Sequence, residues 1–491
     1  MSIHVTIKET KLTPDFKKVI PRFFNTGNER AKIIIARVLQ MPGDAAKTLI
    51  RQIISEFAPK YRHIESIFIK HYGMVQHLLS PDESLQITGD RKALIGAYFT
   101  MEYAIEAAAL FNPSIVTDPD QSNALPGEKK VIISFRATGE SHISSIVFRH
   151  GSLSAECHLT LDPPGKFMNE GRITSITQPD RAIVGNKLSQ LRIPEDIHAR
   201  ILEKIGDPLS SHEIDTLLKD ALHENMELDK LKIRYDILKM VNASYEIQFP
   251  AASVLSERVI FPITYAEKNG IEDARFVRFT NDDGSIIYYA TYTAFDGSFI
   301  IPKLIETKDF LCFKFSSLHG KFSVNKNLAL FPRKINGQYA MLSRIDGVNN
   351  YLMLSDDLYV WENAELLQQP EYPWEFVQIG NGGSPVETEK GWLIITHGVG
   401  PMRKYCLGAT LLDLQNPLVQ LGRLRQPLLM PNENEQHGYV PNVVYSCGSI
   451  VHGEYLFMPF AVSDYSSSFA SMPLSALLDE LEAVPKSAAA H

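Results

Sequence analysis

The sequence predicts an all-β fold, a five-bladed β-propeller, with a helical region before it and a helical segment inserted into it. Three observations indicate this fold. Turns that end in glycine recur at a regular spacing, an aromatic or β-branched run follows each turn, and two other parts of the chain have helical periodicity.

The recurring turns define the strand part. The turn pairs are Asp283-Gly284, Asn336-Gly337, Lys390-Gly391 and His452-Gly453, and the stretch "LPGEKKVIISFRATG" around Gly127 is a fifth copy. A period of roughly 50 residues with several short strands per unit is typical of propeller blades. An antiparallel sandwich with regular hairpins is the alternative fold.

Helical periodicity occupies about 26–110, where "MPGD" and "APK" separate the helices, and again about 195–240. In the second block, Ser210 and Glu213 have the spacing of a capping box. We therefore expect an N-terminal helical region over 1–107, a propeller over 108–475 with a helical insertion at about 165–245, and a C-terminal tail over 476–491.

Composition narrows the class of protein. The 491 residues carry a formal net charge of −8, and Lys and Arg are scattered, which argues against a nucleic-acid partner. The four cysteines lack CxxC spacing, as expected in a reducing compartment. The first residues lack the apolar core of a signal peptide, and no apolar run reaches the roughly 18 residues of a membrane span. We expect a cytoplasmic protein with no membrane partner.

Polar residues close the strands that follow the repeated turns. Equivalent strand ends converge on the central channel of a propeller, so these side chains should face one pocket. Taken singly, each has an equally ordinary explanation as a hydrogen-bonded structural residue. The residues are Arg136, Thr293, Arg344, His397 and Asp464.

One acidic stretch precedes a predicted strand. In "GIEDARFVRF", Glu272 and Asp273 stand beside Arg275 and Arg278. With the other motifs, this stretch resembles glycoside hydrolase family 130, the mannoside phosphorylases and related mannosidases built on a five-bladed propeller. The motifs, between about 110 and 475, are "FNPSIV", "FRATGESHISSIVF", "GIEDARFVRF", "KNLALFPRKINGQYAMLSR", "GNGGSPVETEKGWLIITHGV", "YCLGATLLDLQNP" and "YVPNVVYSCG".

The resemblance implies that Asp273 is the proton donor, with Ala274 where many relatives have Pro. A proton donor must reach the oxygen of the leaving group, directly or through a sugar hydroxyl. The neighbouring cations favour the ionised carboxylate, so some other influence must keep the proton available. A simple ion pair between Asp273 and Arg275 is the alternative.

Phosphorolysis requires cations that hold inorganic phosphate, and the guanidinium fork of Arg matches phosphate oxygens. The resemblance implies that this set is Lys326, Asn327, Arg344, His397 and Tyr405. Lys326 is often Arg in relatives, and Cys406 stands where an Arg often follows the Tyr. The implied sugar contacts are Asn112, Ser114, Arg136, Ser145 and Asp464. Trp374 and Trp392 could stack on a sugar ring, although such residues are more often core.

The resulting prediction is an inverting β-mannoside phosphorylase that uses inorganic phosphate as co-substrate, with no metal or other cofactor, and that could form a homo-oligomer. The first alternative is an inverting β-mannosidase with Glu387 or Asp464 as base, roughly 6.5 to 9.5 Å from the acid. The second is a carbohydrate-binding propeller without catalysis.

Overall fold

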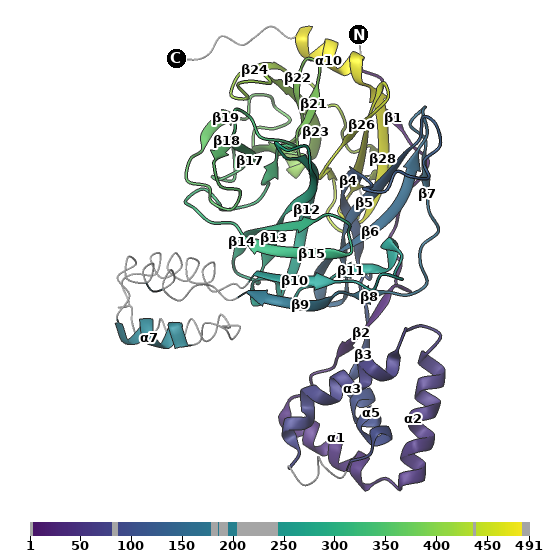
Figure 1. Cartoon of the computed structure of the whole chain (residues 1–491). Coiled ribbons are helices and arrows are strands. Elements are labelled where there is room, and N and C mark those ends of the chain that lie inside the picture. Colours follow the sequence, from purple (N-terminus) through teal and green to yellow (C-terminus); the bar gives the residue numbers. More distant parts are fainter. Residues whose placement is uncertain are drawn as a thin grey trace.

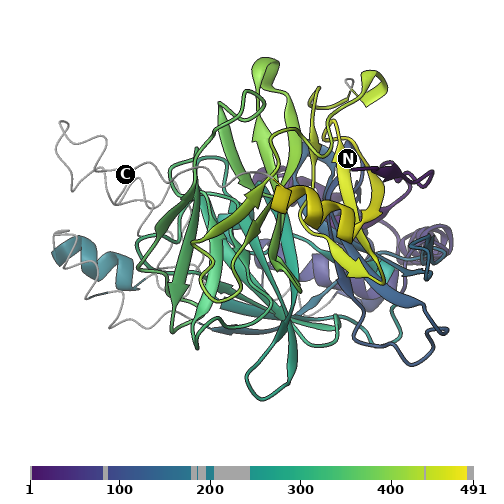
Figure 2. The ribbon, with the colours of Figure 1, turned by 90° about the horizontal axis from the view of Figure 1, so that it is seen from above.

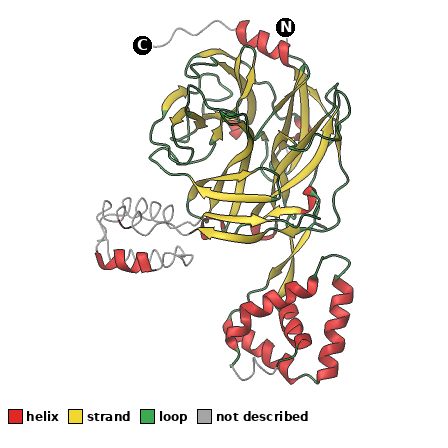
Figure 3. Ribbon diagram, viewed as in Figure 1, coloured by secondary structure: helices red, strands yellow, loops and turns green. Residues whose placement is uncertain are grey.

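The computed structural model describes residues 3–80, 87–177, 185, 195–203, 244–435 and 438–483. It has two visibly different parts, a helical part that precedes most of the strands in the sequence and a larger part built of strands (Figure 1). Colouring by secondary structure shows how sharply the two are separated (Figure 3). The ribbon of β2 (Val19–Phe23) and β3 (Thr100–Ala104) joins them.

The helical part follows the apolar spacing of its sequence. Met41 and Pro42 separate the first two helices, as expected, because proline lacks the amide hydrogen that a continuing helix needs. One apolar cluster joins the four helices described in this part and includes Ile35, Ile50 and Phe68. The helices are α1 (Asn28–Gln40), α2 (Gly43–Phe57), α3 (Ile64–Val75) and α5 (Gly89–Tyr98).

The strand part contains four sheets of four or more strands among the described residues. The first is a twelve-stranded sheet made of β4 (Ala109–Thr117), β5 (Lys129–Thr138), β6 (Ser144–Leu153), β7 (Leu159–Leu161), β8 (Asn169–Glu170), β9 (Arg172–Thr177), β10 (Ser244–Gln248), β11 (Arg258–Ile260), β12 (Gly270–Thr280), β13 (Ile286–Phe295), β14 (Ile300–Thr307) and β15 (Cys312–Ser317). The second consists of β16 (Ala329–Leu330), β17 (Tyr339–Ser343), β18 (Asn350–Ser355) and β19 (Glu365–Gln368). The third consists of β20 (Gln378–Asn381), β21 (Val386–Thr388), β22 (Gly391–Val399), β23 (Tyr405–Leu412) and β24 (Gln420–Arg423). The fourth consists of β25 (Val444–Tyr445), β26 (Ile450–His452), β27 (Tyr455–Val462), β28 (Ser466–Pro473) and β1 (Thr6–Ile7).

The repeated glycine turns are confirmed. Each connects two neighbouring antiparallel strands, β4 to β5, β12 to β13, β16 to β17, β21 to β22 and β26 to β27. All five glycines have positive φ, a conformation that glycine adopts without the steric cost of a side chain. The glycines are Gly127, Gly284, Gly337, Gly391 and Gly453.

The twelve-stranded sheet has two halves that meet at one parallel pair, Gly270 with Ser144 on β12 and β6. The prediction of a largely β fold is confirmed, whereas strand pairing alone does not confirm five blades. Seen from above, the sheets follow one another in chain order around the strand part (Figure 2).

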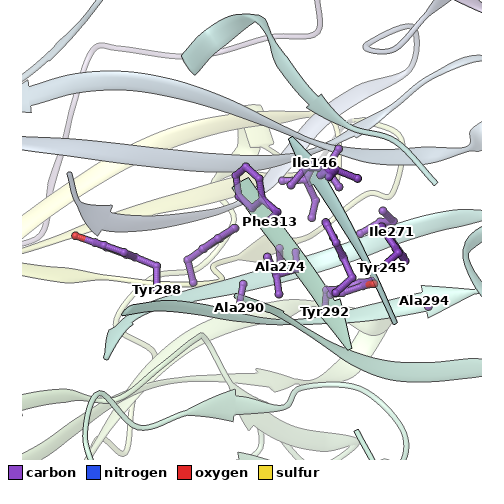
Figure 4. Packing of buried hydrophobic residues seen from close by; sticks show 14 of the residues in the cluster. Ile146, Tyr245, Ile271, Ala274, Tyr288, Ala290, Tyr292, Ala294 and Phe313 are labelled. Carbon is purple, nitrogen blue, oxygen red and sulfur yellow. The ribbon is translucent and has the colours of Figure 1, made fainter. Parts of the chain in front are cut away.

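Among the described residues, five of the larger apolar clusters lie between successive sheets or halves of a sheet. Figure 4 shows the first, in which Ile146 of β6 packs near Ala274 of β12 and Phe313 of β15. The next two extend from β13 to β17 and from β17 to β22. The fourth joins β22 and β23 to β27, and the last joins β27 back to β5, so apolar packing links the last sheet to the first.

The two ends of the described chain meet at the fourth sheet, where β1 pairs with β28. Part of the predicted tail is helical, because α10 (Leu474–Ala483) packs its leucines against the third and fourth sheets. Most of the predicted helical insertion, including Ser210 and Glu213, lies outside the described residues. Its described portions are β8, β9, the start of β10 and α7 (Glu195–Glu203). None of the helices that the structure describes combines the length and apolar character needed to cross a membrane.

Candidate active site

A pocket of about 360 Å³ collects most of the residues expected at the site. Four of the five strand-end residues line it, which confirms the expected convergence for them. Thr293 does not. It is buried on β13 opposite Glu272 and is absent from the lining, so that part of the expectation is wrong. The predicted residues that line the pocket are Asn112, Arg136, Asp273, Lys326, Asn327, Arg344, His397, Tyr405 and Asp464.

Asp273 lies at the centre of a hydrogen-bonded group. Its carboxylate accepts hydrogen bonds from Asn112 Nδ2 at 2.7 Å and from Arg136 Nη1 at 3.3 Å. Arg275 donates instead to the backbone carbonyl of Asp273, at 3.1 Å. The alternative that Asp273 simply pairs with Arg275 is therefore wrong, since the carboxylate faces other partners.

The backbone turns these side chains into the pocket. Asn112 and Asp273 each occupy an irregularity in the pairing of their strands, β4 with β5 and β12 with β13, as β-bulges do when they redirect a side chain. Both have positive φ, 48° and 53°, and so do Asn327 and Asp464. Left-handed backbone at non-glycine residues costs free energy and is concentrated at functional sites.

The charge state of Asp273 follows from its neighbours. Burial raises the pKa of its carboxyl, but the charges of Arg136, Arg275 and Lys326, together with the hydrogen bond from Asn112, outweigh burial and leave the pKa at about 2. The carboxylate is therefore ionised at neutral pH as long as these cations are not neutralised.

Asp464 has the opposite environment. Burial raises its pKa to about 6, and repulsion by Asp273 and Glu272 adds to the effect of burial, while Arg136 opposes it. Two carboxyl groups of one pocket thus have widely separated pKa values.

Most of the expected phosphate ligands have protein partners. Lys326 Nζ pairs with Glu272 Oε2 at 2.8 Å. Asn327, which is buried, donates to the hydroxyl of Tyr445 at 2.8 Å. The ring of Tyr405 stacks near that of His397, with 6.1 Å between centroids.

Arg344 differs from these residues. Its Nη1 lies 3.3 Å from His397 Nε2, and its Nε is buried without a partner. Among the described residues, no carboxylate forms an ion pair with it. Burial lowers its pKa, and the charge of Arg275 adds to the lowering. Arg344 is half-buried, and a partly buried cation without a counter-ion costs folding free energy, which indicates that this charge serves a ligand.

His397 is neutral in this arrangement. Its Nδ1 lies 3.1 Å from the carbonyl oxygen of Asn381 and donates to it, so Nε2 carries the lone pair that accepts from Arg344. Burial and the charges of Arg344 and Arg275 hold its pKa well below the usual value. His397 therefore orients the Arg344 guanidinium.

The pocket carries a surplus of positive charge. Its lining holds the cations Arg136, Lys326, Arg344 and Arg403 against the two carboxylates Asp273 and Asp464. Arg275 and Glu272, which bond to lining residues, add one charge of each sign. The difference of two positive charges matches a phosphate dianion.

Several expected contacts lie elsewhere. Ser114 is buried, and its Oγ accepts from the backbone amide of Phe276 at 3.0 Å. Ser145 is buried too, and neither serine lines the pocket. Trp392 is a core residue, whereas Trp374 is half-buried against glycines of β22 and β23. Glu387 forms two hydrogen bonds with Arg333 outside the pocket, so it is not placed as a base.

The sequence did not predict the roles of Tyr445 and Glu272, which position the expected site residues through hydrogen bonds. Tyr445 accepts from Arg275 at 2.7 Å and from Asn327, while Glu272 bonds to both Arg136 and Lys326. Tyr445 stands in the quoted motif "YVPNVVYSCG" and Glu272 beside Asp273, so their positions were a usable signal. Within the described ranges, no group of three His, Cys, Asp or Glu side chains is arranged to hold a metal ion.

Comparison with known proteins places the chain in a family. Residues 228–483, more than half of the chain, match the glycoside hydrolase family 130 model described as beta-1,4-mannooligosaccharide phosphorylase. A "1,2-beta-oligomannan phosphorylase" of Thermoanaerobacter sp. is 35% identical over 215 residues, 43% of this chain and 70% of that protein. A "Beta-1,2-mannobiose phosphorylase" of Listeria innocua serovar 6a is 32% identical over 235 residues, 46% of this chain and 64% of that protein.

A solved structure of beta-1,2-mannobiose phosphorylase from Listeria innocua in complex with beta-1,2-mannobiose aligns with a TM-score of 0.46 at 22% identity, over 78% of this chain and 94% of that chain. The largely β fold, the motifs and the family match define a carbohydrate-active enzyme class. The chain belongs to glycoside hydrolase family 130.

Proposed function

We propose that the protein is an inverting β-mannoside phosphorylase that transfers a mannosyl group from an oligosaccharide to inorganic phosphate, without a further cofactor. The observation that carries this proposal is Arg344, a half-buried arginine whose Nε is buried without a partner and which has no carboxylate partner among the described residues, in the same pocket as Asp273. A hydrolase would gain nothing from retaining such a cation. The names of the relatives, which refer to phosphorylases, support the same reaction.

In the proposed reaction Asp273 supplies the proton to the glycosidic oxygen, directly or through a sugar hydroxyl. Phosphate attacks the anomeric carbon from the opposite face, the glycosidic bond breaks, and the sugar leaves as a 1-phosphate. Asn112 Oδ1, buried without a hydrogen-bond partner, and the carboxylate of Asp464 accept hydrogen bonds from sugar hydroxyls.

Phosphate also makes the acid available. With the cations uncompensated, the pKa of Asp273 is about 2, too low for a proton donor at neutral pH. A phosphate dianion beside Lys326 and Arg344 cancels the charges that stabilise the carboxylate, and thereby raises its pKa. Proton donation is thus coupled to occupation of the phosphate site. Asn327, His397 and Tyr405 complete the wall of that site.

We also propose that the sheets are the blades of a five-bladed propeller over 108–475, preceded by a helical region over 1–107 whose strand β1 joins the last blade. The five apolar clusters between successive sheets support this arrangement, because each blade of a propeller packs on the next. The four free cysteines support a reducing location such as the cytoplasm.

The test is a panel of β-1,2- and β-1,4-linked mannosides, each incubated with and without phosphate. We propose a β-1,2 linkage, because the relatives that align over 205 residues or more are named for it, whereas a relative named for a β-1,4 linkage aligns over 140 residues. The expected product is mannose 1-phosphate, formed only when phosphate is present. Free mannose as the main product at saturating phosphate would replace this proposal by a mannosidase.

A further inference from the structure

A second cavity, of about 650 Å³, lies between the helical part and the strand part. One wall comes from β2 and from residues 61–71 at α3, the other from β8, β9 and the segment around Phe261. It shares no lining residue with the active-site pocket. We call it the junction cavity.

Its charge is positive. The lining contains Arg22, Arg62, Lys70 and Arg172 but only one carboxylate, Glu170. Arg22 pairs with Glu170, and Arg62 pairs with Glu257 at 3.2 Å. Lys70 and Arg172 are exposed, and neither has an ion-pair partner among the described residues. Two positive charges are therefore unmatched.

The two paired arginines are held in place by aromatic rings. The Arg22 guanidinium lies 4.1 Å from the centroid of Phe261, and that of Arg62 lies 4.7 Å from the centroid of Phe167. Arg62 Nε is buried and has no hydrogen-bond partner in the described structure. Buried donors are seldom left unpaired, so this one indicates a missing acceptor.

His71 also lines the junction cavity, beside cations that come from several different elements. His71 Nδ1 lies 2.7 Å from Thr100 Oγ1, whose hydroxyl donates to the carbonyl oxygen of Gly96. Burial, and then the charges of Lys70 and Arg22, lower the pKa of His71 to about 4. The imidazole is therefore neutral, and the positive charge of the cavity rests on Lys and Arg.

We propose that the junction cavity binds a small molecule that carries a phosphate group on an organic body. Guanidinium forks and a lysine suit the phosphate, and the apolar wall formed by Ile247, Val259 and Phe261 suits the body. The volume lies within the range of roughly 300 to 1,000 Å³ of small-molecule sites. Because both parts of the protein form the walls, the ligand links them.

The test is isothermal titration calorimetry on full-length protein carrying Arg344→Ala, which suppresses phosphate binding at the active site. The probes are mannose 1-phosphate, adenosine monophosphate, inorganic phosphate and adenosine. We expect at least one phosphate ester to bind and adenosine, which lacks the phosphate, not to bind. Adding Lys70→Gln and Arg172→Gln should weaken the ester by at least about tenfold, since each hydrogen bond to a charged group contributes strongly.

The matched control adds Lys47→Gln and Arg51→Gln on the exposed face of α2, which should leave affinity unchanged. Inorganic phosphate that binds as tightly as the esters, with the same loss in the Lys70 and Arg172 variant, would support an anion site filled by free phosphate. Absence of binding by all three anions, or equal affinity in the two double variants, would overturn the proposal. Failure of phosphorolysis would not change either outcome, because the assay measures binding with Arg344 removed.

Discussion

The active-site pocket and the junction cavity both carry two more positive charges than negative ones, yet they hold them differently. In the pocket, Arg344 is half-buried, and its neighbour His397 lies on a strand that is buried along its length. In the junction cavity, Lys70 and Arg172 are exposed. The difference is one of cost, because a partly buried unpaired cation opposes folding more than an exposed one does.

The active-site pocket is where the fold maintains charge at the expense of stability. The pocket also has left-handed backbone at Asn112, Asp273, Asn327 and Asp464. Both features lower the stability of the fold, so both indicate selection for chemistry. In the junction cavity the two unmatched charges, Lys70 and Arg172, are exposed and carry little of that cost, which suits a site that binds without catalysing.

The largest expected effect is that of Asp273→Asn. The carboxamide keeps a hydrogen bond with Arg136 or Asn112 but cannot donate the proton, so turnover of an unactivated mannoside should fall by about a hundred- to ten-thousand-fold. Initial rates and calorimetric binding of the disaccharide measure the two effects separately. Turnover close to wild type would show that the proton comes from another group.

Arg344→Ala should lower phosphorolysis by about ten- to hundredfold at subsaturating phosphate, the equivalent of one lost hydrogen bond to a charged group. Because Arg344 has no carboxylate partner in the described structure, its removal should not lower the melting temperature. The control is Arg333→Ala, which removes a half-buried arginine that is paired with Glu387 outside the pocket. A fall in melting temperature without a change in phosphate dependence would make Arg344 a structural residue.

The pH profile should report Asp464. Its folded pKa of about 6 predicts that kcat/KM falls as the pH drops below about 6, where the carboxyl is protonated and accepts fewer sugar hydrogens. Since this pKa is raised relative to the unfolded chain, the folded state loses stability as the pH rises through the interval between the two pKa values. Asp464→Asn should remove both effects, while the titration of phosphate itself remains. A profile unchanged by Asp464→Asn would assign the transition to another group.

The smallest expected effect is that of thiol modification. Cys312 is exposed, whereas Cys157, Cys406 and Cys447 are buried, and burial raises the pKa of Cys447 near the pocket to about 12. Iodoacetamide should label one thiol per folded chain, as counted by mass spectrometry, and leave activity unchanged. Loss of activity on thiol modification that substrate prevents would show that a thiol at the pocket is accessible, and would contradict this prediction.

The sequence predicted the regular features of the fold well. Positive φ at Gly284 or Gly337 is a local requirement of a tight turn, so the residue type reveals it. The apolar spacing of α1 and α2 likewise depends on nearby residues. The count of blades was harder, because a single contact between Gly270 and Ser144 merges two halves into one sheet.

The candidate site was predicted less completely. Strand-end positions revealed Arg136, Arg344 and His397, because such positions converge in this kind of fold. Thr293 occupies an equivalent place in sequence but is buried opposite Glu272. The position of Thr293 outside the pocket and the burial of Ser114 depend on β-bulges and on packing between sheets. Residue type alone does not encode either of these.

The pairing of β1 with β28 has a consequence for how the chain folds. Thr6 lies opposite Ser471, so the first of these two segments must wait until the second, far along the chain, has left the ribosome. Contacts between such distant positions form late, since closing a long loop costs entropy before the contact repays it. The helical part lies between β1 and β4 and can acquire its local contacts earlier. Formation of the fourth sheet is therefore the slow step of folding. Substitutions that only improve helix propensity should accelerate refolding less than substitutions that favour this sheet.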